Sequence, residues 1–422
     1  MSERRDARGL RAAIQTRIRP SQVECPPMNV EDFLSRRAIL ALVGALALSS
    51  VTACERKSEG GGAASTTGDI LVGFYGSLTG AGASFGQSSR EGAELAVDEV
   101  NAAGGVLGGR KIKLLVEDDQ TKPEEASSAV TKLITQDKVV AVIGEVASTR
   151  TLAAAPVAQR YQVPMITPAS TNAKVTEVGN YIFRVCFIDP FQGEVLAKFA
   201  YNDLKARKIA VLKDISEDYS VGLTDVIVKV FAELGGQVID PVSYSKGDSD
   251  FRAILTKVRS LKPDAIVATG YYTEAGIIVR QARELGMTMP ILGGDGWVGE
   301  PLANGREALK NTFISNHYSG ENPDPVVQTF VKNYRTKFSH EPDSIAALAY
   351  DTVKVLADAF TRAAGTDAAK VRDALAVADV PGVTGRLKMN EKRDVVKPAV
   401  IEEVTFVDGK VKFVYRTTIN PS

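Results

Sequence analysis

The sequence predicts an α/β protein made of two doubly wound lobes, in which mainly parallel sheets are covered by helices on both faces. Apolar runs rich in β-branched residues alternate with amphipathic stretches of helical period, which is typical of βαβ units. This alternation occurs as two series of similar size, one before and one after residue 200. A chain of 422 residues, 44% hydrophobic and 24% charged, is long enough for two such domains.

The first series starts at Asp69 and supplies the elements expected in one lobe. An apolar run opens each unit, and a stretch of helical period follows it. Strands are expected over residues 70–75, 111–117, 139–144 and 163–167, with helices over 89–102, 123–136 and 149–161. Residues 76–86 are expected to form a glycine-rich loop that closes over a ligand.

The second series repeats the pattern and is followed by a helical block. Paired glycines end the helix at residues 235 and 236, as expected for a helix C-terminus. Strands are expected over 208–212, 237–244, 265–269 and 290–292, with helices over 219–234, 250–261 and 274–285. Helices over 325–338, 345–364 and 368–376 and strands over 399–407 and 411–416 would return to complete both lobes.

Residues 1–53 are predicted to be an N-terminal extension and an export signal. Arg36 and Arg37 precede an apolar core of about 11 residues, which is too short for a permanent membrane span. The segment Val51–Cys54 resembles a bacterial lipobox, in which the cysteine is lipidated. Cys54 would then anchor the protein to a membrane, and residues 54–68 would form a flexible tether with a span of about 20 Å. The predicted location is the periplasm or the cell surface.

Charge and composition argue against several classes of protein. Lys and Arg together number 51, as do Asp and Glu, so there is no excess of basic residues to favour nucleic acid. Only His317 and His340 are available, both in an apparently polar region, which argues against a histidine triad or metal site. No cofactor or metal is expected, and Cys186 is expected to be a buried small hydrophobic residue.

Two predicted strand ends in the first lobe suit a carboxylate. The strand over 139–144 leads to Ser148, at an expected helix N-cap, and the strand over 163–167 leads to Ala169 and Thr171. Hydroxyl groups and free backbone N–H groups at such ends bind anions. Capping of helices is the alternative role for Ser148 and Thr171.

In the second lobe, Asp295 lies between glycines after a predicted strand, and Tyr219 and Tyr271 follow two others. Ligands of open α/β sheets bind outside such strand ends, where a carboxylate and aromatic rings suit an ammonium. A turn aspartate that bonds its own backbone is the alternative. The two lobes together therefore suggest a receptor for a free α-amino acid. Asp295→Ala is expected to weaken binding at least tenfold and to leave thermal stability nearly unchanged.

From Asp69 to about Val414 the chain resembles type I periplasmic binding proteins of the leucine/isoleucine/valine family, the receptors of amino-acid ABC transporters. The matching runs are GFYGSLTGAGASFG, AELAVDEVNAAGGVLGGRK, VIGEVAST, PMITPAST and GYYTEAGIIVRQARELGM. The resemblance implies a three-strand hinge, with crossings near residues 188, 316 and 395. Lobe 1 would then comprise 69–188 and 317–395, and lobe 2 would comprise 189–316 and 396–422.

The resemblance also implies the roles of the site residues. Ser148, Ala169 and Thr171 would hold the α-carboxylate and assist with the ammonium, and Asp295 would replace the family's usual glutamate. Tyr219 and Tyr271 would complete the site in lobe 2. Phe85, Val146, Ala147 and Ile345 would form the side-chain pocket.

The expected function is that of a monomeric receptor, not an enzyme, which delivers a branched-chain or other small aliphatic amino acid to transporter membrane subunits. The alternatives are a receptor of this fold for an amide, a urea-like compound or an aromatic acid, or a sensory binding protein. A dehydrogenase is disfavoured. The glycines at 80, 82 and 86 have the spacing GxGxxxG, which is a weak match to a dinucleotide-binding loop, and the predicted export signal opposes it because nicotinamide cofactors are scarce outside the cytoplasm.

Overall fold

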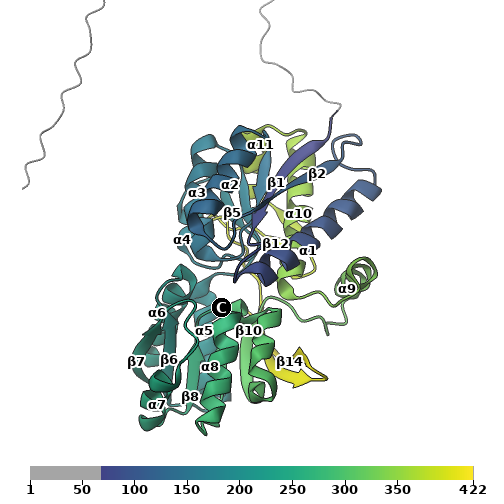
Figure 1. The fold of residues 1–422 in the computed structure, drawn as a ribbon. Helices are drawn as coiled ribbons and strands as arrows, with labels where there is room; N and C mark the ends of the chain where they lie inside the picture. Colours follow the sequence, from purple (N-terminus) through teal and green to yellow (C-terminus); the bar gives the residue numbers. More distant parts are fainter. Residues whose placement is uncertain (1–67, 422) are drawn as a thin grey trace, which may run out of the picture. The chain divides into compact units, whose positions relative to one another are not determined.

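The first sheet contains five parallel strands, formed by the first series of βαβ units (Figure 1). The computed structural model describes residues 68–421. The strand order is β2-β1-β3-β4-β5, and every neighbouring pair is parallel. The strands are β1 (Ile70–Gly76), β2 (Ile112–Asp118), β3 (Ala141–Ile143), β4 (Met165–Thr167) and β5 (Ile182–Arg184).

Helices cover both faces of this sheet. On one face, buried side chains of α2 and α3 pack against alternate strand residues such as Val142 and Ile182. On the other face, α1 and α10 pack against the intervening residues such as Ile143 and Phe183. The helices of this lobe are α1 (Ala83–Ala102), α2 (Pro123–Thr135), α3 (Ser148–Tyr161), α4 (Lys174–Glu177), α9 (Pro325–Phe338), α10 (Ser344–Ala363) and α11 (Ala368–Ala376).

The second sheet has seven strands in the order β14-β13-β10-β9-β8-β6-β7. Strands β6 to β10 are parallel to one another, whereas β13 pairs antiparallel with β10 and with the edge strand β14. The strands are β6 (Lys208–Asp214), β7 (Gln237–Tyr244), β8 (Ala265–Ala268), β9 (Ile291–Gly293), β10 (Thr312–Asn316), β13 (Ala399–Val407) and β14 (Lys410–Ile419). The helices are α5 (Asp189–Lys198), α6 (Asp218–Glu233), α7 (Arg252–Ser260) and α8 (Tyr272–Glu284). Short helical turns occupy Phe199–Asp203, Asp295–Trp297 and Glu300–Leu309.

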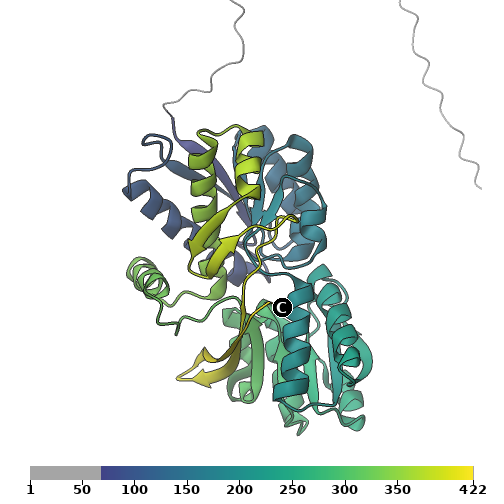
Figure 2. The same cartoon turned by 180° about the vertical axis from the view of Figure 1, so that it is seen from behind.

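The chain passes between the two sheets three times, as Figure 2 shows from behind. The first passage joins β5 to α5, the second leaves β10, and the third leads to β13 from the small sheet of β11 (Asp379–Gly382) and β12 (Gly385–Lys388). The predicted α/β class with two helix-covered, mainly parallel sheets is confirmed. We keep the lobe limits given above as a proposal, and we call the regions around the first and second sheets lobe 1 and lobe 2.

The structure corrects the local predictions near the site. Helix α1 begins at Ala83 and not at residue 89, so Phe85 lies in the first turns of a helix and not in a flexible loop. Gly86 permits this, since a Cβ there would lie 2.0 Å from the Ser77 carbonyl oxygen. The N-cap of α3 is Ala147, one residue before the predicted Ser148. The elements α4, β5, α5, β10, β11 and β12 have no counterpart among the expected strands and helices.

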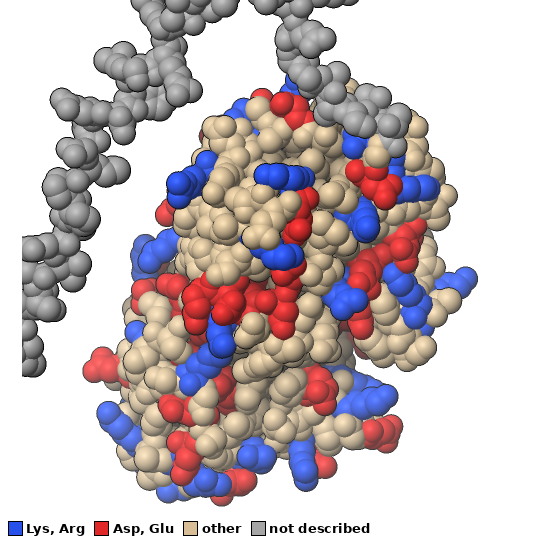
Figure 3. All heavy atoms as spheres, turned by 45° about the horizontal axis from the view of Figure 1, so that its top comes forward, with Lys and Arg blue, Asp and Glu red and all other residues tan. Residues whose placement is uncertain are grey.

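The predicted export signal, the lipobox and Cys54 lie outside the described residues. Within residues 68–421 we find no helix with the length and apolar character needed to cross a bilayer. Cys186 is fully buried, as expected, and carries a free thiol. On the face shown in Figure 3, Lys and Arg side chains are scattered, and acidic side chains gather near its middle.

Candidate functional site

Nine of the residues singled out from the sequence line one small cavity between the lobes. They come from helices and loops of both lobes, and the carboxyl ends of strands in both sheets meet there. The lining residues are Phe85, Val146, Ser148, Ala169, Thr171, Tyr219, Tyr271, Asp295 and Ile345, together with Gly296. Ala147 is buried nearby but does not line the cavity, and its N–H donates to Glu145 Oε2 at 2.6 Å.

The lobe 1 half of the cavity offers hydrogen-bond donors. Strands β3 and β4 are adjacent and parallel, so the segments that follow them lie side by side. Ser148 is the first residue of α3, and its N–H and that of Thr171 donate to no protein acceptor in the described part of the chain. The Ser148 hydroxyl oxygen accepts from the Asn172 N–H at 3.2 Å, which leaves its own proton free. Free N–H groups at a helix N-terminus and a free hydroxyl suit a carboxylate.

The lobe 2 half presents the carboxylate of Asp295, just after β9. Its Oδ1 accepts from Gln192 Nε2 at 2.7 Å and from the Tyr219 hydroxyl at 2.9 Å. Its Oδ2 lies 2.9 Å from His317 Nε2. The alternative in which Asp295 bonds only its own turn is therefore wrong. The expectation that Asp295→Ala leaves thermal stability nearly unchanged is also revised. Alanine would leave the buried donors of Gln192, Tyr219 and His317 without an acceptor.

Sequence reasoning missed Gln192 and His317 as partners of Asp295. The sequence around His317 indicates a polar region, but its side chain is buried and stacks on Phe187 with ring centroids 3.7 Å apart. Gln192 lies in α5, an element without a predicted counterpart. Both residues lie far from Asp295 in sequence, and no local pattern marks them as its neighbours.

Burial shifts the protonation of two groups around Asp295. It lowers the pKa of His317 to about 4, although the bond with Asp295 opposes the shift. Burial also raises the pKa of Asp189 to about 8, and the charge of Asp295 adds to this rise. At neutral pH, His317 is therefore uncharged and Asp189 is mainly protonated, so neither neutralises Asp295 nor adds a second negative charge to the site.

Aromatic and aliphatic side chains close the rest of the cavity. The Tyr219 and Tyr271 rings stack with centroids 5.3 Å apart, and Phe85 meets the Tyr271 ring edge-on at 5.4 Å. Val146 and Ile345, both buried, add branched aliphatic surface from lobe 1. This wall offers an apolar surface to whatever part of a ligand lies away from Ser148 and Asp295.

Bonds across the cleft hold the two lobes together in a closed arrangement. The backbone of Asp218 donates to Thr149 Oγ1 and accepts from Asn172 Nδ2, both at 2.8 Å. The Tyr272 hydroxyl donates to the Ala81 carbonyl oxygen, also at 2.8 Å. In this arrangement of the chain, both lobes would contact a ligand in the cleft. Residues 68–421 contain no group of three or more side chains placed to hold a metal ion.

Comparison with known proteins identifies the family of the chain. The periplasmic binding protein family matches residues 69–405. An amino acid binding protein of Pseudomonas aeruginosa is 35% identical over 332 residues, which cover 77% of this chain and 87% of that protein.

Two solved structures are similar over most of their length. A leucine-binding protein, LivK, from Thermotoga maritima has a TM-score of 0.79 and 40% identity, covering 83% of this chain and 99% of that one. LivJ, the substrate-binding protein of a branched-chain amino acid transporter from Streptococcus pneumoniae, was solved in complex with isoleucine. It has a TM-score of 0.76 and 35% identity, covering 82% of this chain and all of that one. The chain belongs to the periplasmic binding protein family, whose members are solute-binding receptors.

Proposed function

We propose that the protein is an extracytoplasmic receptor that closes around a free α-amino acid and delivers it to the membrane subunits of an ABC transporter. One observation carries the proposal: a cavity between the lobes has free N–H donors of Ser148 and Thr171 on one side and the Asp295 carboxylate on the other. This polarity suits a zwitterion, because each charged end meets groups of complementary character. The similar LivJ structure contains isoleucine, which supports the assignment of the ligand class.

The proposed side chain of the ligand is small and aliphatic. Phe85, Val146 and Ile345 offer an apolar wall, and a polar group placed against it would lose hydrogen bonds to water without replacement. We propose that Cys54 carries a lipid and that residues 54–68 tether the receptor to the membrane. The lipobox-like segment Val51–Cys54 and the polar, glycine-rich composition of residues 55–68 support both proposals.

The function is tested by calorimetric titration of the mature protein after removal of bound ligand by unfolding and refolding. The probes are L-leucine, L-isoleucine, L-valine and L-alanine, with L-leucinamide and 4-methylpentanoate as analogues that lack one charged end. We expect tight binding of at least one amino acid and binding at least tenfold weaker for both analogues. Binding of an amide, a urea or benzoate in preference to every amino acid would refute the proposal and support the alternative ligand classes.

The anchor is tested separately, in cells that express the full chain. Mass spectrometry of the mature N-terminus should find Cys54 as the first residue, with a mass increase for acyl chains. Cys54→Ser should release the protein from the membrane fraction. An unmodified N-terminus elsewhere would contradict the anchor without affecting the proposed ligand.

A further inference from the structure

His317 connects the passage between the lobes to the carboxylate of Asp295. It directly follows β10, where the chain leaves the second sheet, and its side chain is buried. Its ring stacks on Phe187, which lies in the first passage, at a centroid distance of 3.7 Å and an angle of 25°. The residue therefore lies where two of the three interlobe passages meet, and its Nε2 is 2.9 Å from Asp295 Oδ2.

The chemistry of this contact determines which nitrogen carries the proton. A carboxylate can only accept, so Nε2 of His317 must donate to Oδ2. Burial keeps the ring neutral, which leaves one N–H in total and makes Nδ1 an acceptor. Nδ1 is buried and has no hydrogen-bond partner in the described part of the chain. An Nδ1 that carries no proton is what the Nε2–H tautomer requires.

The three donors leave Asp295 with little freedom. Each carboxylate oxygen has two lone-pair positions. Those of Oδ1 are taken by Gln192 and Tyr219, whereas Oδ2 accepts only from His317. The position that remains free is on Oδ2, the oxygen that His317 holds. An ammonium that binds Asp295 at this free position would meet the oxygen whose orientation depends on His317.

We propose that His317 is a positioning residue for the ligand's ammonium group. Its neutral Nε2–H fixes Oδ2 of Asp295 so that the free lone pair faces the cavity, and it links ammonium binding to the hinge. This inference rests on the proposed function, because it concerns the same site. It identifies a specificity element that belongs to a passage between the lobes and not to a strand end.

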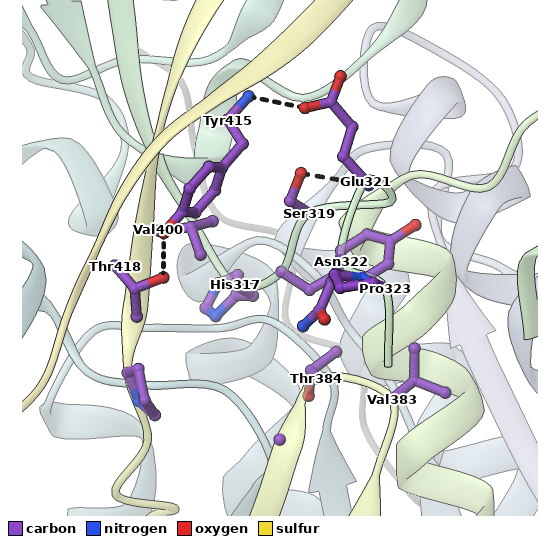
Figure 4. A pocket seen from close by; sticks show the side chains of 13 residues that line it. His317, Ser319, Glu321, Asn322, Pro323, Val383, Thr384, Val400, Tyr415 and Thr418 are labelled. Atoms are coloured by element: carbon purple, nitrogen blue, oxygen red, sulfur yellow. Dashed lines mark hydrogen bonds between the residues drawn. The ribbon is translucent and has the colours of Figure 1, made fainter. Parts of the chain in front are cut away.

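The surroundings of His317 decide which variants test the proposal. On the hinge side, His317 borders a pocket of about 510 Å³, beside Ser319, Thr384 and Val400 (Figure 4). A much smaller side chain at position 317 would admit water from this pocket, and water could replace the lost donor. The variants should therefore keep most of the volume of the ring. His317→Leu removes the donor, and His317→Gln supplies an amide N–H in its place.

The test is calorimetric titration with L-leucine of both variants, alone and in an Asp295→Asn background. His317→Leu should weaken binding about tenfold or more, and His317→Gln should recover at least part of the loss. In the Asp295→Asn background, His317→Leu should cost less than about threefold, because its action passes through the Asp295 carboxylate. His340→Gln is the matched control, since His340 is exposed and should leave the affinity unchanged.

A second readout is the ¹⁵N spectrum of the two imidazoles, which are the only histidines of the sequence. At pH 7 His317 should be the Nε2–H tautomer and should shift on addition of L-leucine, whereas His340 should not shift. Three results would overturn the inference and leave the proposed function intact. They are an unchanged affinity of His317→Leu, a loss of affinity in the double variant equal to the product of the two single losses, and an Nδ1–H tautomer. Failure of the unsubstituted protein to bind any amino acid would overturn both.

Discussion

Replacement of Asp295 by asparagine removes a charge while the hydrogen-bond geometry can be kept. The amide oxygen can face Gln192 and the Tyr219 hydroxyl, and the amide nitrogen can face His317. A change of tautomer would let His317 Nε2 accept in place of donating. We therefore expect the free energy of unfolding of the ligand-free protein to change by less than about 1 kcal/mol. Asp295→Ala should instead cost about 3 kcal/mol or more, because three buried donors lose their acceptor.

The same substitution should strongly affect binding. The free lone pair of Oδ2 becomes an N–H that points toward the ligand's ammonium, so a charge-assisted bond worth about 1.5–3 kcal/mol is lost. This corresponds to at least about 10- to 150-fold weaker binding of L-leucine. Titration calorimetry measures the affinity, and urea denaturation without ligand measures stability. Asp225→Asn, an exposed site in lobe 2, controls for the change in net charge. An affinity for L-leucine within twofold of the unsubstituted protein would refute the role of Asp295.

Three further predictions concern other groups around the cleft. Ser148→Ala should weaken L-leucine binding about tenfold and L-leucinamide binding less, as titration of both ligands would show; equal losses would contradict a carboxylate contact. Asp189 has a pKa of about 8 against 3.8 when free, so the fold favours its protonated form and loses stability as the pH rises from about 4 to 8. Asp189→Asn should remove this loss, a gain of about 4 kcal/mol at pH 7 that denaturation at pH 5 and pH 7 would reveal; an unchanged pH slope would contradict it. Glu217 Oε1 of lobe 2 lies 3.8 Å from Arg150 Nη1 of lobe 1, which forms an ion pair across the cleft. Glu217→Gln should therefore favour the open state, seen as a larger radius of gyration by X-ray scattering without ligand and several-fold weaker L-leucine binding; an unchanged radius would argue against this role for the pair.

Local sequence patterns are sufficient to predict both strand ends in lobe 1. A short apolar run followed by small hydroxyl residues has few alternative structures, and parallel strands bring their carboxyl ends to one edge of the sheet. The pattern alone therefore predicts that Ser148 and Thr171 lie close together, and β3 and β4 are indeed neighbours. The position of Asp295 follows from the same rule applied to the second sheet.

The helix that carries Phe85 shows where local reasoning fails. Three glycines between residues 80 and 86 favour a loop by propensity, yet residues 83–86 of that stretch begin α1. The glycine at 86 is required because α1 packs directly against the backbone of Ser77. A tertiary contact thus overrides a local preference, and only the packed structure reveals it.

By itself, the sequence determined the α/β class, the two series of units and the cavity residues that follow strands, because hydrophobic period and strand-end chemistry are local properties. The family resemblance added Val146 and Ile345. The tertiary structure alone decided how Asp295 is held. Gln192 and His317 reach it from positions 103 and 22 residues away, through a helix and an interlobe passage whose places depend on the packing of the whole chain. Hydrogen bonds between such distant residues leave no period or spacing in the sequence, since their geometry exists only once both lobes have folded and closed.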